Sequence, residues 1–280
     1  MGVARHTPWH FLCYLHALYP NAGHVALTQY MSKTASNGGN DNTHELFTHL
    51  RFYREGGVKG APTMNTVVGG VNCDLALKGQ GSGSTFVAIW NFMSRNMEHL
   101  KKCKMDIWGR REDKDVNTKV FIEKTTLHKR YFQGSEAEGF QRMVQDRFFG
   151  IDCIGFVGQY MVYAGEWPAY KGMAPKKWPL HHCKTPVNEA GKVKALDFLV
   201  WVTSGHIAII DEVFETIDGV VHVDVCQSSS GGPQLNEFVY LKAVEMDGNG
   251  RMRYKFHNRG SPAMPVGGEV YIMRRDSFTL

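Results

Sequence analysis

Apolar residues follow two different spacings along this chain. Before residue 195 they recur mainly at intervals of three or four, which is typical of helices with one buried face. Ser135 and Glu138 form a capping box, in which each side chain can satisfy a free backbone N–H at the start of a helix. Gly165 is placed to end the next helix, because glycine readily adopts the backbone conformation found there. We predict helices over 8–31 (with a turn at 19–23), 86–100, 136–148 and 153–164.

After residue 195 the pattern becomes strand-like, with apolar and polar residues largely alternating. Asp218-Gly219 lies between two such runs and predicts a hairpin turn. The expected strands are 196–202, 206–213, 220–227, 237–244, 251–257 and 268–274, with earlier ones at 46–53 and 119–123. Helices followed by antiparallel strands indicate an α+β fold. The charged segment 109–118 suggests a domain boundary, between an N-terminal region, 1–118, and a C-terminal domain, 119–280.

The composition is that of a chain that can fold around an apolar core. Of 280 residues, 43% are hydrophobic and 21% are charged, which argues against disorder. No segment approaches the roughly 18 apolar residues of a membrane-spanning helix. The net charge of +5 is mild and the basic residues are dispersed along the chain, so we expect no nucleic-acid partner. Because no apolar segment is long enough, we also expect no integral membrane segment.

The six cysteines lie far apart, and no pair has CxxC spacing. This pattern disfavours a disulfide scaffold and a zinc ribbon, so we expect reduced thiols, no metal and no organic cofactor. The short apolar run at 9–18 contains two histidines and is followed by no cleavage site of small residues. We therefore expect no signal peptide, and synthesis in the cytoplasm.

Cys153 is the strongest candidate nucleophile. It stands in the first turn of a predicted helix, where free backbone N–H groups and the helix dipole favour the thiolate. Asp152 can cap this helix through its carboxylate, and Gly155 and Gly158 let another element approach the helix closely. A thiol also needs a base to react at neutral pH, and His206, at the head of a predicted strand, is the candidate.

A third polar side chain is needed to orient the imidazole of His206. If the hairpin turns where expected, His206 lies opposite about position 229 on the returning strand. On that strand Gln227 continues a face of three valines, which we take as the core face toward the helix. Asp224 and His222 lie on the other face, and a bulge would be needed to bring them round. We rank Gln227 first, Asp224 second and His222 third.

Three segments together resemble the hallmark of the NlpC/P60 cysteine peptidases, which is Asp-Cys-Ser-Gly-Phe-Val, then Gly-Asp-Leu-Val, then Gly-His-Val-Gly-Ile-Tyr. The segments here are Asp152-Cys153-Ile154-Gly155-Phe156-Val157, Leu196-Asp197-Phe198-Leu199-Val200 and Gly205-His206-Ile207-Ala208-Ile209-Ile210. Their order agrees, and the likeness covers residues 130–235 approximately. Ile154 stands where the family has Ser, and the third catalytic residue is not an obvious His.

This resemblance implies a papain-like catalytic domain over 119–280, with Cys153 as nucleophile, His206 as base and the backbone N–H of Cys153 in the oxyanion hole. It also implies a substrate, because the family cleaves peptide bonds in bacterial peptidoglycan. Lacking a signal peptide, such an enzyme would reach the wall as an exported antibacterial effector or a phage-type lysin. An effector would be accompanied by an immunity protein.

Two other functions fit the same residues. A papain-like acyltransferase or deamidase would use the same thiol and imidazole on a protein or lipid substrate. A binding module with an inactive site would keep the pattern without the chemistry, and Cys153 would then react with iodoacetamide no faster than the other thiols. In each case residues 1–118 would serve targeting or recognition.

Overall fold

The computed structural model describes residues 6–16, 46–54, 75, 79–102, 105–112, 119–121, 134–145, 150–170, 183–229, 232–258 and 268–275. The chain divides into two compact units, one of Tyr14–Asp152 and one of Met1–Cys13 with Cys153–Leu280. The division thus falls immediately before Cys153, whereas we placed it at 118. Among the described residues, no helix combines the length and the apolar character needed to cross a bilayer.

The unit Tyr14–Asp152 contains an antiparallel sheet with the strand order β1-β2-β3. Its described elements are β1 (Leu46–Arg54), α2 (Gly83–Lys102), β2 (Met105–Glu112), β3 (Lys119–Phe121) and α4 (Glu136–Gln145). We did not predict β2, because charged residues fill its second half and hide the strand pattern. Residues 109–112 of the charged segment lie in β2, which pairs with β3, and the rest of that segment lies outside the described residues.

The capping box at the start of α4 is confirmed. The backbone N–H of Glu138 donates to Ser135 Oγ at 3.3 Å, and the backbone N–H of Ser135 donates to the Glu138 carboxylate at 3.0 Å. The rings of Phe140 on α4 and Trp90 on α2 then pack edge to face, 5.2 Å apart. Local capping and one aromatic contact therefore fix the place of this helix beside α2.

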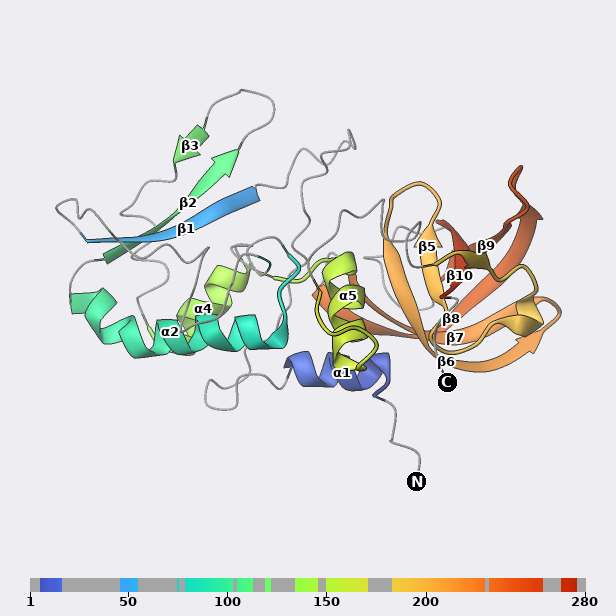
Figure 1. Ribbon diagram of the computed structural model, residues 1–280, viewed down its shortest axis with the longest axis horizontal. Helices are drawn as coiled ribbons and strands as arrows, with labels where there is room; N and C mark the ends of the chain where they lie inside the picture. Colours follow the sequence, from blue (N-terminus) through green and yellow to red (C-terminus); the bar gives the residue numbers. More distant parts are fainter. Residues whose placement is uncertain are drawn as a thin grey trace. The chain divides into compact units, whose positions relative to one another are not determined.

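The other unit is built on an antiparallel β-barrel, with α5 (Cys153–Tyr163) beside it (Figure 1). The barrel strands are β5 (Phe198–Trp201), β6 (Ile207–Ile217), β7 (Val220–Ser229), β8 (Gly232–Met246), β9 (Met252–His257) and β10 (Glu269–Arg274). They are hydrogen bonded in the order β10-β5-β6-β7-β8-β9, and pairing of β9 with β10 closes the barrel. The short β4 (Thr185–Pro186) pairs with the C-terminal end of β10, at Met273 and Arg274, and a 3-10 turn, η2 (Ala190–Lys192), follows it. All six strands expected after residue 195 are present, which confirms the α+β class.

Alternate residues of the six strands point into the barrel and form one apolar core. Val221, Val223 and Val225 belong to this core and are fully buried. We expected the valine face to be the side toward the helix. Instead it lines the barrel interior, and the core cluster contains no residue of α5.

Helix α5 covers the outside of the barrel, where it packs on β6 and β7. Ile207, Ile209 and Cys226 alternate with the interior residues and are also buried, because this face is covered too. Both faces of these two strands are therefore buried close to the helix, although neither strand is apolar along its whole length.

A second helix, α1 (Pro8–His16), packs beside α5. The ring of Phe11 lies 5.3 Å from that of Phe156, and the backbone N–H of Trp9 donates to the Asp211 carboxylate at 2.7 Å. The acidic Asp211 side chain thus meets the N-terminus of α1, where the helix dipole favours negative charge. The rest of the helix predicted over 8–31 lies outside the described residues.

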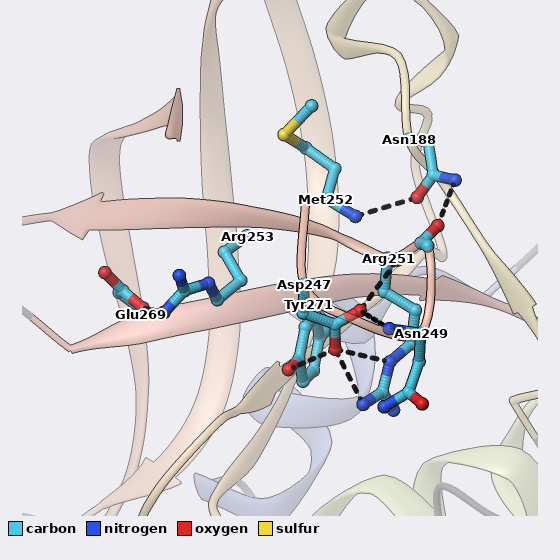
Figure 2. A network of polar contacts seen from close by, with 9 residues as sticks. Asn188, Asp247, Asn249, Arg251, Met252, Arg253, Glu269 and Tyr271 are labelled. Atoms are coloured by element: carbon cyan, nitrogen blue, oxygen red, sulfur yellow. Dashed lines mark hydrogen bonds and ion pairs between the residues drawn. The ribbon is translucent and has the colours of Figure 1, made fainter. Parts of the chain in front are cut away.

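A polar network ties the β8–β9 turn to the neighbouring strand (Figure 2). The carboxylate of Asp247 accepts hydrogen bonds from the backbone N–H groups of Asn249 and Arg251, both at 2.9 Å, and from the Arg251 guanidinium at 2.8 and 3.0 Å. It also accepts the hydroxyl of Tyr271, on β10, at 2.8 Å. The side chain of Asn188 makes two further hydrogen bonds to the backbone of this turn. Its Nδ2 donates to the carbonyl of Gly250 and its Oδ1 accepts the backbone N–H of Met252, both at 2.9 Å. These hydrogen bonds connect the exposed turn to β10 and to Asn188 at this end of the barrel.

Candidate functional site

His206 and Gln227 are joined by a hydrogen bond. The imidazole Nε2 lies 2.6 Å from Gln227 Oε1. Gln227 is fully buried, and its Nε2 donates to Oδ1 of Asn236 at 2.5 Å. The same Oδ1 accepts Nε2 of Gln234 at 3.3 Å. The structure therefore aligns one imidazole with two side-chain amides in a continuous row.

The register of the β6–β7 hairpin produces this contact. Asp218 and Gly219 turn the chain with φ of 49° and 75°, and Ile210 then lies opposite Val225. Continuing the same pairing brings His206 beside the end of β7, where we expected it. The pairing next to the turn differs from the expected register by two residues, and irregularities between Val213 and Glu215 and between Ile210 and Glu212 remove this difference. The third residue that we ranked first thus touches the candidate base, while its catalytic role stays a prediction.

Trp201 covers one side of the imidazole. The two rings lie 4.7 Å apart at 70°, and the backbone N–H of Trp201 donates to the His206 carbonyl at 2.9 Å. Trp201 is only 3% exposed and belongs to the barrel core. Burial lowers the pKa of His206 below its ordinary value of 6.5, and the hydrogen bond with Gln227 offsets part of this effect. His206 is consequently a neutral imidazole at pH 7, as a general base must be.

Cys153 begins α5, whose first backbone N–H groups have no partner within the helix itself. Its side chain is 3% exposed. Helix α5 packs on β6, which His206 immediately precedes, and on β7, which carries Gln227. The candidate nucleophile is thus on the helix that rests on the strands of the candidate base and its partner.

The residues flanking Cys153 are closely packed. Asp152 is 1% exposed, and its backbone N–H donates to the carbonyl of Gly79 at 2.6 Å. Gly155 is buried within α5. At Gly158 a Cβ would lie 2.5 Å from the ring of Tyr170, so the close approach predicted from this glycine is confirmed. The helix that carries Cys153 is therefore tightly held.

Asp224 and His222 make other contacts. Asp224 Oδ1 accepts the backbone N–H of Phe238 at 2.9 Å, and the ring of His222 meets that of Tyr240 at 5.5 Å. β7 has no bulge that would turn either side chain toward His206, because the irregularities of its two hairpins shift its partners instead. The structure therefore brings only Gln227, of the three candidates, into contact with His206.

Two residues that contact this row, Asn236 and Trp201, were not predicted from the sequence. Asn236 pairs with Val225, so its side chain shares the interior face with Gln227. A bulge at Phe238, whose φ is 52°, shifts the alternation of β8 between Asn236 and the apolar Val239. Without that bulge the two would lie on opposite faces. Trp201 could have been found from its place opposite His206 on the preceding strand.

Asp197, within the segment that resembles the family, has a structural place. It is 1% exposed, and both of its oxygens accept the guanidinium of Arg274 at 2.7 Å. Across the described ranges, no three His, Cys, Asp or Glu side chains are grouped to hold a metal ion. No family model matches this sequence, and no curated protein or solved structure is significantly similar to it.

Proposed function

We propose that this chain is a papain-like cysteine hydrolase of the NlpC/P60 type that cleaves amide bonds in peptidoglycan stem peptides. The hydrogen bond between His206 and Gln227 is the observation that carries the proposal. A buried amide oxygen that accepts one imidazole N–H fixes the ring and leaves the other nitrogen as a base. The Cys153 helix, packed on β6 and β7, supplies the thiol.

The proposed reaction uses side chains and backbone alone. His206 Nδ1 takes the thiol proton of Cys153, and the thiolate attacks the carbonyl carbon of the substrate amide. The resulting oxyanion is stabilised by the backbone N–H of Cys153 at the start of α5. The imidazolium then protonates the leaving amine, and His206 next activates a water that hydrolyses the thioester and restores the thiol.

The choice of peptidoglycan rests on the resemblance of the three segments around Cys153, Asp197 and His206 to the NlpC/P60 hallmark. The net charge of +5 is compatible with adsorption to an anionic cell wall. Such an enzyme would reach its substrate as an exported antibacterial effector or as a phage-type lysin. An effector would be accompanied by an immunity protein that blocks this site.

Digestion of purified sacculi tests the proposal. Wild type, Cys153→Ala and Cys13→Ala would be compared by new amine termini and by mass spectrometry of the released muropeptides. Cys13 is an exposed thiol and serves as the matched control. We expect cleavage by wild type and Cys13→Ala, and none by Cys153→Ala.

Cleavage that survives Cys153→Ala, or sacculi left intact by wild type, would overturn the proposal. In the second case, a mass increase on Cys153 after incubation with protein or lipid acyl donors would identify an acyltransferase. A mass change of a glutamine in an added protein would identify a deamidase.

A further inference from the structure

His206, Gln227 and Asn236 form a row of hydrogen bonds, and the donors in that row can all point one way or all point the other way. Each amide presents one acceptor and one donor, so reversing Gln227 also requires reversing Asn236 and moving the imidazole proton to the other nitrogen. Gln227 is fully buried and Asn236 is 6% exposed, so a mismatch cannot be relieved by bulk water. The orientation of Asn236 and the tautomer of His206 are therefore coupled.

The structure has one of the two directions. Asn236 Oδ1 faces Gln227 Nε2 and Gln234 Nε2, at 2.5 and 3.3 Å, and Gln227 Oε1 faces His206 Nε2 at 2.6 Å. Two donors thus converge on the Asn236 oxygen, which opposes rotation of that amide. The proton of the neutral imidazole must then be on Nε2, because Gln227 offers it only a lone pair.

We infer that Asn236 is a positioning residue, which fixes the amide of Gln227 and thereby keeps the proton of His206 on Nε2 and the lone pair on Nδ1. This role rests on the proposed function only in assigning Nδ1 the thiol proton of Cys153. The tautomer itself can be measured whether or not the protein hydrolyses anything.

Nitrogen NMR of the histidine rings tests the inference. The Cys153→Ala protein is used, above the pKa of His206, so that the imidazole is neutral and no thiolate perturbs it. A bare ring nitrogen resonates far downfield of a protonated one, and His206→Asn assigns the signals. Asn236→Asp retains an acceptor toward Gln227, whereas Asn236→Leu has none. Asn188→Leu is the matched control, since it removes an amide that bonds the β8–β9 turn.

We expect the proton on Nε2 in the parent, in Asn236→Asp and in Asn188→Leu, and a mixture of tautomers in Asn236→Leu. With Cys153 present, Asn236→Leu should slow alkylation of that thiol about tenfold, the effect of one hydrogen bond, and Asn236→Asp should restore the rate. A proton on Nδ1 in the parent, or an unchanged tautomer in Asn236→Leu, would overturn the inference. Intact sacculi together with a locked tautomer would instead contradict only the proposed function.

Discussion

His206 and Gln227 stand on the two arms of one hairpin, 21 residues apart, with Nε2 and Oε1 separated by 2.6 Å. The contact depends on a two-residue turn at the far end of that hairpin and on Gly205, which reaches φ of 66° just before His206. A side chain within the barrel can in this way orient an imidazole at its rim.

Replacing Gln227 by Met removes the acceptor with little change in volume. A hydrogen bond to a group that becomes charged contributes about 1.5–3 kcal/mol, so kcat/KM on muropeptides should fall roughly tenfold to a hundredfold. Asp224→Asn and His222→Ala are the matched controls, because neither side chain contacts the imidazole. Equal losses in all three variants would contradict the assignment of Gln227 as the orienting residue.

Trp201 keeps water from His206, so Trp201→Leu should raise the pKa of His206 toward 6.5. Wild type, whose His206 has a lowered pKa, should lose stability as pH falls from 6.5 through that pKa, because the unfolded chain takes up the proton first. The variant should show a smaller loss in that window. NMR titration of the His206 ring gives the pKa directly, and Trp201→Phe serves if the leucine variant unfolds. An unchanged pKa in both variants would exclude the shielding role.

The strands and the turn of the β6–β7 hairpin could be predicted because short-range signals specify them. Asp218-Gly219 specifies the turn, and the alternation of Val221, Val223 and Val225 places Gln227 on their face, although this face lines the barrel interior and not the side toward the helix. The two irregularities in β6 that shift the pairing before it reaches His206 have no such local signal. Closure of the barrel could not be predicted, since it depends on pairing between β9 and β10. The interior position of Asn236 could not be predicted, because it depends on the bulge at Phe238 and no residue pattern in the sequence indicates that bulge.

Gly158 is needed because Tyr170 occupies the space of a side chain. Alanine is favoured over glycine inside a helix by about 1 kcal/mol, but here its Cβ would lie 2.5 Å from the Tyr170 ring, and such overpacking costs about 1–3 kcal/mol. Gly158→Ala should therefore be neutral or destabilising in wild type and stabilising when Tyr170→Ala is also present. Urea unfolding of the four proteins measures this reversal. Gly191→Ala, where a Cβ meets nothing within 4 Å, is the control.

The β8–β9 turn should contribute to acid sensitivity. The hydrogen bond from the Arg251 backbone, with those from Tyr271 and the Arg251 side chain, holds the pKa of Asp247 well below its usual range. Its contribution to stability is therefore present above the unfolded pKa of about 3.9 and is lost as pH falls below it. Asp247→Asn should lower Tm at pH 7. It should also reduce the loss of Tm between about pH 4 and 2, the range in which the Asp247 carboxylate of wild type becomes protonated. An equal loss of Tm between about pH 4 and 2 in wild type and Asp247→Asn would contradict this role.

Activation of the Cys153 thiolate by His206 is the step on which the proposed function depends. It is tested most directly by the rate of iodoacetamide alkylation of each cysteine at pH 6–7, followed by peptide mass spectrometry in wild type and His206→Ala. Accessibility alone would favour the exposed Cys13, and burial raises the pKa of Cys226. We predict that Cys153, although buried, reacts at least about tenfold faster than Cys13, and that His206→Ala removes this advantage. Reaction at Cys153 no faster than at the other thiols, or a fast reaction that persists in His206→Ala, would contradict the account.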